Sequence, residues 1–180
     1  MTDMHVHRSA QGEAATPLLD RFAALRDADS ASPQDLDAIW AALPTASVED
    51  VLGVWRGGEF ASGHPQNGQL DTAGWFGKSF LSPSQAHPLI MTREDGSLYS
   101  DLESGKGLAT LWPVGFRSET TASMVYDGQP VIDHFKPVTA DLLMGIMSVK
   151  GELSDAPYYF FLERAPEATV IDYSTAEVER

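Results

Sequence analysis

Three side chains stand out as the ones whose types and positions are best suited to chemistry: an adjacent acid and histidine, and a loop histidine. Asp133 and His134 are neighbours in a segment rich in β-branched and aromatic residues, and His64 follows an expected strand in a loop bounded by glycine and proline. Because neighbours in a strand point to opposite faces, Asp133 and His134 cannot easily pair with each other. The one that points inward is expected to need a buried partner, either in the protein or in a ligand.

Each of these residues also has a structural interpretation. His64 is a candidate polar contact to a ligand, a candidate axial ligand of a metal or haem, or a loop histidine without a role. For Asp133 and His134, the alternative to a ligand contact is a satisfied structural network with Arg117 and Lys136 as charge partners. Tyr126, at the end of an expected strand, is a candidate to offer its hydroxyl at the rim of a barrel.

The sequence lacks the motifs that mark common enzyme classes. It has no cysteine, and its five histidines show no metal-binding spacing. It has no HExxH helix, no phosphate-binding loop, no GxGxxG before a helix and no GxSxG. We therefore assign no catalytic or metal-binding residue and identify no cofactor, and a binding protein is preferred over an enzyme.

Composition restricts the partners and the location. The chain of 180 residues has 26 acidic and 12 basic residues, a net charge of −14, which argues against nucleic acid or an anionic membrane surface as a partner. No apolar run approaches the roughly 20 residues that a membrane helix needs, and no signal peptide is evident. Together with the absence of cysteine, this predicts a cytoplasmic protein, a monomer or a homodimer, without membrane insertion.

The expected elements change character at residue 53. Before it, residues 1–15 are expected to form a disordered tail and residues 16–52 a helical segment. A first helix is predicted to open at Pro17, and a second to begin with Ser32 as its cap and Pro33 at its first position. A third capping signal at 47–50 supports about one turn.

From residue 53 onward, turn signals, aromatics and β-branched residues predict eight antiparallel strands. Their expected ranges are 53–62, 74–80, 89–92, 107–116, 119–126, 131–138, 141–150 and 158–164. The last strand is apolar on both faces, since Tyr158, Phe160 and Leu162 alternate with Tyr159 and Phe161. A closed or nearly closed barrel explains this, with one face inside and the other beneath the helices. We expect one domain over 16–164, whose barrel combines 53–105 with 106–164, and an acidic tail over 165–180.

Two segments resemble a known pair of sequence families. Val54-Trp55-Arg56-Gly57-Gly58, preceded by Gly53, resembles the family named for its GXWXG motif. The segment 124–135, continuing through Gly145 to Arg164, is similar to the uncharacterised C-terminal domain that usually accompanies GXWXG. This resemblance covers about residues 30–165 and implies no established activity.

A more distant resemblance is to lipocalins and other calycins. Those barrels begin with Gly-x-Trp after a short helical turn, and a basic residue of the last strand lies across that tryptophan. The corresponding residues here are Gly53, Trp55 and Arg164. The resemblance implies a mainly β fold, a calycin-like antiparallel barrel behind two or three short helices, which holds a small apolar ligand. Gly53, Trp55, Gly57 and Arg164 are expected to be structural.

The predicted function is the binding of a small hydrophobic or amphipathic molecule, such as a fatty acid or an isoprenoid-like compound, in a barrel cavity. Small residues on the strands, Ala122, Ser123 and Gly145, are expected to leave space for it. The alternatives are an enzyme that acts on a lipid- or polyketide-like substrate with His and Asp groups, and a structural barrel with a filled interior. The candidate ligand-binding residues are Phe60, His64, Trp75, Phe80, Met124, Tyr126, Asp133, His134, Met144, Met147, Tyr159 and Phe161.

Overall fold

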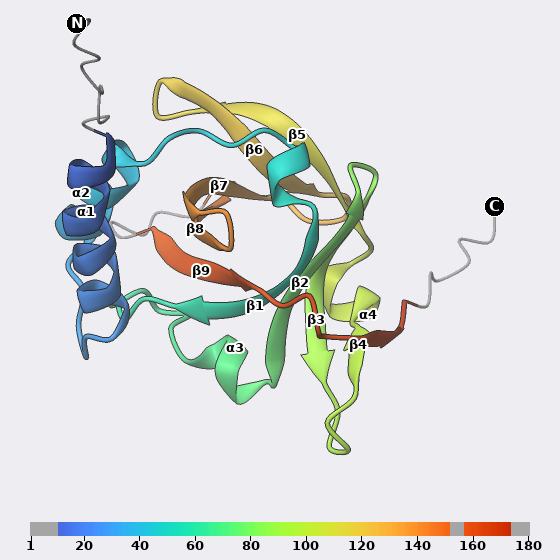
Figure 1. Ribbon diagram of the computed structural model, residues 1–180. Helices are drawn as coiled ribbons and strands as arrows, with labels where there is room; N and C mark the ends of the chain where they lie inside the picture. The colour runs from blue at the N-terminus through green and yellow to red at the C-terminus, as the bar shows by residue number, and fades with distance from the viewer. Residues whose placement is uncertain (1–10, 152–156, 174–180) are drawn as a thin grey trace, which may run out of the picture.

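The computed structural model describes residues 11–151 and 157–173, which form a β-barrel with helices at its side and ends (Figure 1). The helices are α1 (Gln11–Arg26), α2 (Pro33–Ala42), the single 3-10 turn η1 (Glu49–Val51), α3 (Gln69–Thr72) and α4 (Leu102–Gly105). The strands are β1 (Gly53–Glu59), β2 (Trp75–Ser82), β3 (Gln85–Thr92), β4 (Leu98–Ser100), β5 (Ala109–Phe116), β6 (Glu119–Tyr126), β7 (Val131–Thr139), β8 (Leu142–Val149), β9 (Tyr158–Arg164) and β10 (Val170–Asp172).

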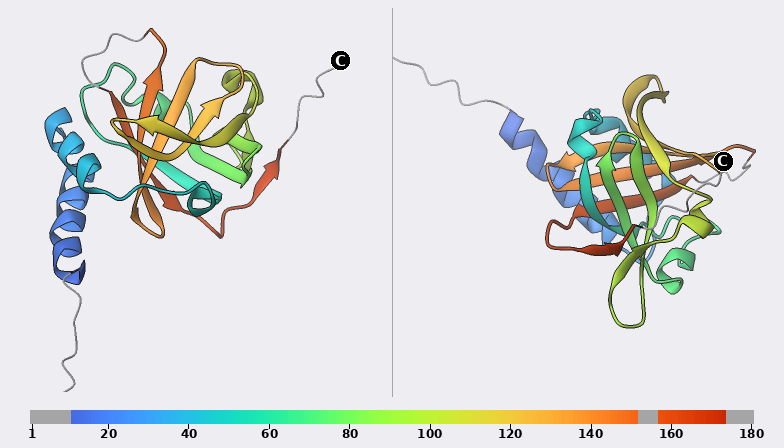
Figure 2. Two further views of the ribbon diagram at one scale, coloured as in Figure 1. Left: turned by 90° about the horizontal axis from the view of Figure 1, so that it is seen from above. Right: turned by 90° about the vertical axis from the view of Figure 1, so that its right-hand side faces the viewer.

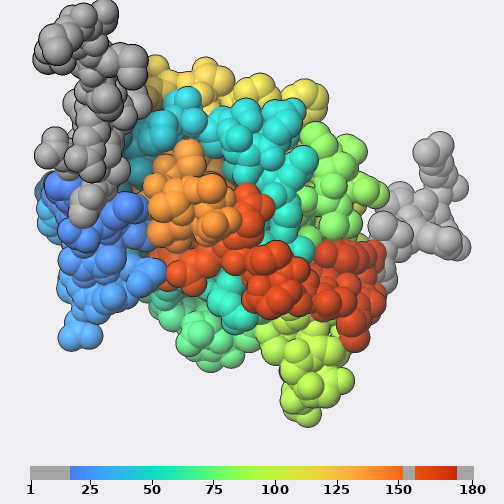
Figure 3. All heavy atoms as spheres, viewed as in Figure 1, coloured from blue at the N-terminus to red at the C-terminus, as the bar shows by residue number. Residues whose placement is uncertain are grey.

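Eight of the strands close into an antiparallel barrel. The sheet runs β3-β2-β1-β9-β8-β7-β6-β5, and a pairing between Ala86 of β3 and Ala109 of β5 closes it. The strands β4 and β10 continue the sheet from β3 outside the barrel, and β10 lies along the surface beside β4 (Figure 3). The prediction of a mainly β, closed antiparallel barrel behind short helices is confirmed.

The two faces of β9 are covered in different ways. Phe160 and Leu162 belong to the apolar core inside the barrel, whereas Tyr159 and Phe161 pack in a second cluster with residues of α1 and α2. Figure 2 shows both helices against this side of the barrel. The helix side of that second cluster consists of Phe22, Leu36, Ile39, Trp40 and Leu43. Apolar side chains on both faces of one strand are thus buried because a helical layer covers the outer face.

Trp55 and Arg164 close the barrel near η1. Trp55 is fully buried, and its indole N–H donates to the carbonyl oxygen of Val51 at 2.7 Å. The guanidinium carbon of Arg164 lies 4.2 Å from the centroid of the Trp55 ring, and its Nη1 donates to the carbonyl of Leu52 at 2.9 Å. This is the arrangement that the resemblance to calycins implies.

The element boundaries differ from expectation in several places. The first helix begins at Gln11 and contains Pro17 in its interior, because Gln, Glu and Ala before the proline are good helix formers. β3 begins at Gln85 and continues through Pro88. Pro88 has no paired residue on either side, because it lies at a register shift of β3 against β2 and between the pairings of β3 with β5 at Ala86 and with β4 at Ile90. The short elements α3, α4, β4 and β10 were not predicted, and β10 occupies part of the expected acidic tail.

Parts of both predicted tails, residues 1–10 and 174–180, lie outside the described residues. Among the helices of the described residues, none is both long enough and apolar enough to cross a membrane.

Candidate functional site

A cavity of about 290 Å³ lies at one end of the barrel, between α3 and α4. Its walls are mainly apolar and are contributed by Leu70, Leu89, Val131, Met147, Val149 and Phe160. Four uncharged polar residues also line it, namely Gln66, Gln69, Ser104 and Gln129. β9 begins at this cavity with Tyr158 and ends at the Trp55 stack with Arg164, so cavity and stack lie toward opposite ends of that strand.

A buried ion pair stands in the wall of the cavity. The Nζ of Lys78 lies 2.8 Å from Oδ2 of Asp133, and the two side chains are only 5% and 2% exposed. Removing both charges from water is costly, and a buried pair of this kind is weak evidence for stability. Replacing such a pair by apolar side chains is often neutral or stabilising, so this pair is a candidate for a role beyond packing.

Aromatic side chains surround the ammonium group of Lys78. Its Nζ lies 5.6, 5.7 and 5.4 Å from the ring centroids of Trp75, Tyr126 and Phe160. It also donates to the carbonyl oxygen of Pro88 at 3.2 Å and to the Tyr126 hydroxyl at 3.3 Å. Three rings, a carbonyl and a carboxylate therefore stabilise the buried cation.

Tyr126 connects the cation to the carboxylate. Its hydroxyl donates to Oδ2 of Asp133 at 3.3 Å. Burial raises the pKa of Tyr126 well above its ordinary value, and the nearby charge of Asp133 raises it further. Tyr126 thus stays protonated, and Oδ2 of Asp133 accepts from both Lys78 and Tyr126.

Two polar atoms at this cavity have no partner among the described residues. They are the second carboxylate oxygen of Asp133, Oδ1, and the indole N–H of Trp75. Both residues line the cavity. Both atoms have almost no accessible surface, and buried polar atoms are nearly always hydrogen-bonded.

A β-bulge places Trp75 and Lys78 together. The pairing of β2 with β3 shifts register on both sides of Gly77, so Trp75 and Lys78 both line the cavity although three positions separate them. A Cβ on Gly77 would lie 2.0 Å from the carbonyl oxygen of Trp55, so only glycine fits there. Across β1, a Cβ on Gly57 would lie 2.1 Å from the Trp75 ring, so Gly57 leaves the room that this indole occupies.

Hydrogen bonds and a ring contact hold the loop after β1 beside the cavity. The Tyr158 hydroxyl donates to Oε2 of Glu59 at 2.6 Å, and burial together with that carboxylate raises the pKa of Tyr158. His64 is buried, packs edge-on against Tyr158 with ring centroids 5.4 Å apart, and accepts the backbone N–H of Gln66 on Nδ1 at 3.2 Å. His64 therefore helps to hold the segment that leads to α3.

The twelve residues expected to bind ligand lie in four places. Trp75, Tyr126, Asp133 and Met147 line the cavity. Phe80 and Met124 belong to the core cluster inside the barrel. The remaining aromatic and methionine side chains lie in the cluster beneath the helices, namely Phe60, Met144, Tyr159 and Phe161. The two histidines, His64 and His134, lie outside the cavity lining.

Asp133 lines the cavity, and His134 is on the other side of β7. His134 is stacked on Phe116 with ring centroids 3.8 Å apart, and its Nδ1 is 2.9 Å from the hydroxyl of Ser123. Burial, and to a smaller extent the charge of Arg117, lowers the pKa of His134 to about 4. His134 is therefore neutral near pH 7 and cannot form an acid–base pair with Asp133.

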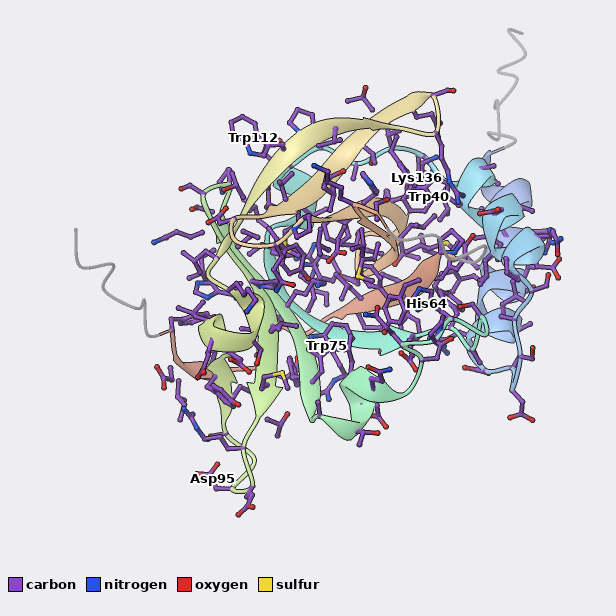
Figure 4. All side chains as sticks on the ribbon, turned by 180° about the vertical axis from the view of Figure 1, so that it is seen from behind. Trp40, His64, Trp75, Asp95, Trp112 and Lys136 are labelled. Atoms are coloured by element: carbon purple, nitrogen blue, oxygen red, sulfur yellow. The ribbon has the colours of Figure 1, made fainter. Side chains whose placement is uncertain are left out.

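The two cations expected as charge partners of Asp133 and His134 have other partners. Arg117 forms an ion pair with Asp37, and Lys136 donates to the carbonyl oxygens of Trp40 and Leu43 at 3.1 and 2.9 Å. Figure 4 shows Lys136 and Trp40 together near the helices, whereas Trp75 lies beside α3.

Sequence reasoning missed six polar residues of the site, namely Lys78, Tyr158, Gln66, Gln69, Ser104 and Gln129. A signal for Lys78 was available, because it is the only charged residue in the otherwise apolar and small strand Trp75–Ser82. The space that small strand residues such as Gly145 were expected to leave for a ligand is partly filled by side chains. A Cβ on Gly145 would lie 2.2 Å from the ring of Phe160. Within the described residues, no group of three or more His, Asp or Glu side chains could hold a metal ion.

These features define a class of protein: a small closed barrel with one amphipathic cavity, consistent with a binding protein. Residues 38–96 match the GXWXG protein family, and residues 107–164 match a domain of unknown function, DUF4334. The crystal structure of a protein from Thermomonospora curvata is similar, with 34% sequence identity and a TM-score of 0.73 over 85% of this chain and 99% of that chain. The chain belongs to the GXWXG family, with DUF4334 as its C-terminal part. Among curated proteins, no significant match was found.

Proposed function

We propose that this protein binds a small hydrophobic or amphipathic molecule in the barrel cavity, within the cytoplasm. The observation that carries the proposal is a mainly apolar cavity whose lining includes a buried ion pair. Ligand sites typically combine apolar walls with a few fixed polar groups. Of the residues expected to bind, we assign direct contact to Trp75, Tyr126, Asp133 and Met147.

The size of the cavity limits the ligand. Its volume of about 290 Å³ is at the low end of the about 300–1,000 Å³ found for ligand pockets. This favours a medium-chain fatty-acid-like or short isoprenoid-like compound over a long-chain lipid.

The proposal is tested by titrating an environment-sensitive apolar dye into the wild type and two matched variants. Leu89→Trp fills the cavity wall, whereas Leu81→Trp makes the same change on β2 at a side chain that is 49% exposed. Dye binding is expected to be lost in Leu89→Trp and kept in Leu81→Trp. Equal binding by all three proteins would place the dye site elsewhere and contradict the proposal.

A second candidate function is catalysis in the same cavity. The observation that favours it is a buried carboxylate in the cavity lining, Asp133, whose Oδ1 has no protein partner among the described residues and is a candidate general base. Tyr126 would be the available proton donor, while His64 and His134 do not line the cavity. Mass spectrometry of a ligand incubated with wild type and with Asp133→Asn separates the two functions. Conversion by the wild type alone would support an enzyme.

A further inference from the structure

Lys78 carries an amine in the wall of the cavity. Its side chain is almost fully buried, and its Nζ lies 2.8 Å from Oδ2 of Asp133 and 3.3 Å from the Tyr126 hydroxyl. The ring centroids of Trp75 and Phe160 lie 5.6 and 5.4 Å from the same atom. All four of these neighbours line the cavity, as Lys78 itself does. The amine therefore lies among side chains that a bound ligand would contact.

The other lysines of the chain differ from Lys78 in this respect. They are Lys106, Lys136 and Lys150, and among the residues that the structure describes none of them lines the cavity. Lys106 and Lys150 are exposed. Lys136 is buried like Lys78, but its Nζ donates to carbonyl oxygens at the C-terminal end of α2. Lys136 is thus a buried amine without a cavity beside it, in the same protein.

A lysine amine becomes a nucleophile when it gives up a proton, and in apolar surroundings such amines form imines with carbonyl compounds. The Asp133 carboxylate is a proton acceptor in contact with the amine of Lys78. On this basis, and resting on the proposed function, we propose that Lys78 binds a small apolar aldehyde covalently, as an imine, inside the cavity. An aldehyde suits the site because its carbonyl carbon carries one chain only and reacts with amines more readily than that of a ketone.

The reaction leaves the charge of the ion pair unchanged. The Nζ of Lys78 passes one proton to Oδ2 of Asp133 and attacks the aldehyde carbon, whose oxygen becomes a hydroxyl with a second proton from the nitrogen. Asp133 returns its proton to this hydroxyl, which leaves as water while the C=N bond forms. The nitrogen keeps one proton and the positive charge. Asp133 therefore has a cation beside it before and after the reaction, and no new charge is buried.

The test uses octanal together with sodium cyanoborohydride, which reduces an imine to a stable secondary amine. Mass spectrometry of the digested protein then locates the octyl group on individual lysines. Lys78 is expected to be modified about tenfold or more faster than Lys136, because the cavity holds the aldehyde beside its amine. An excess of the apolar dye is expected to slow the modification of Lys78 and of no other lysine.

Two matched variants test the assignment to Lys78. Lys78→Arg keeps a cation beside Asp133, but a guanidinium forms no such imine, so the cavity adduct should be lost while the other lysines react as before. Lys150→Arg makes the same change at an exposed lysine and should leave the rate at Lys78 unchanged.

Asp133→Asn removes the proton acceptor and is expected to slow the modification of Lys78 about tenfold or more. This variant leaves Lys78 without its charged partner and is open to misfolding. Lys78→Arg retains the ion pair, so it tests the proposal even if Asp133→Asn does not fold.

The outcomes separate the imine from the proposed function. If octanal displaced the dye but left Lys78 unmodified, the cavity would remain a ligand site and the imine would be overturned. Modification of Lys78 at a rate that the dye does not change, or no faster than that of Lys136, would also overturn it. If neither octanal nor the dye bound, the proposed function would fail, and the imine with it.

Discussion

At the scale of single residues, the neighbours Asp133 and His134 lie in different surroundings. His134 contacts Ser123 and Phe116 outside the cavity, whereas Asp133 lines the cavity and pairs with Lys78. Strand alternation predicted that these neighbours face opposite sides. It could not predict which one faces inward, because a register slip of one residue reverses the faces.

His134 should make stability depend on pH. Its pKa is about 4 in the folded protein and about 6.5 when unfolded, so the unfolded chain binds the proton more readily. Its contribution, on the order of 3 kcal/mol, is present above pH 6.5 and is lost as the pH falls toward 4. Urea unfolding of the wild type and of His134→Asn between pH 6.5 and 4 measures this contribution to stability.

The variant is expected to lose stability less steeply as the pH falls. His87, whose pKa burial also lowers, contributes in the same direction and is unchanged in the variant. Parallel pH profiles for the two proteins would contradict the assignment to His134.

Trp55 and Arg164 give a second prediction at this scale. Trp55→Ala should reduce the free energy of unfolding by about 3–5 kcal/mol, as for a large buried aromatic residue. Arg164→Ala removes the stacking guanidinium and its bonds to the carbonyls of Leu52 and Asp50, and should also reduce stability. Dye affinity of folded Arg164→Ala should match the wild type. A large loss of affinity would mean that Arg164 belongs to the site.

At the scale of elements, most strands could be predicted from the sequence, because β-branched and aromatic runs between turn signals mark them well. Strand β2 shows where prediction from local sequence patterns fails. Strict alternation would separate Trp75 from Lys78, and the bulge at Gly77 brings both to the cavity. A bulge depends on the close approach of another strand, here the carbonyl of Trp55, which no local pattern reveals.

The docking of α2 on β7 depends on Lys136. This fully buried side chain donates to the carbonyl oxygens of Trp40 and Leu43 at the end of α2 and also contacts Glu119. Lys136→Met keeps the length of the side chain but leaves those carbonyls unpaired, so stability should fall by about 2–4 kcal/mol. The exposed Lys150 provides a matched control, and Lys150→Met should change stability little. Equal, small effects of both substitutions in thermal unfolding would contradict this role.

At the scale of the whole molecule, the two family matches are parts of one barrel. The GXWXG match includes β1, β2 and β3, and the DUF4334 match includes β5 to β9. The two parts join where β1 pairs with β9 and where Ala86 pairs with Ala109. The cavity takes residues from both parts, since Trp75 and Lys78 come from the first, and Tyr126 and Asp133 from the second. Its polar contacts could not be read from either part alone.

The central claim, a ligand cavity of limited length inside the barrel, is tested most directly by calorimetric titration with straight-chain primary alcohols of six to sixteen carbons. Each added CH₂ buried in the cavity should contribute about 0.8 kcal/mol, roughly fourfold in affinity. We expect this gain to stop within this series, at the chain length that fills the cavity of about 290 Å³. A steady gain through sixteen carbons, or no saturable binding at any length, would contradict the claim.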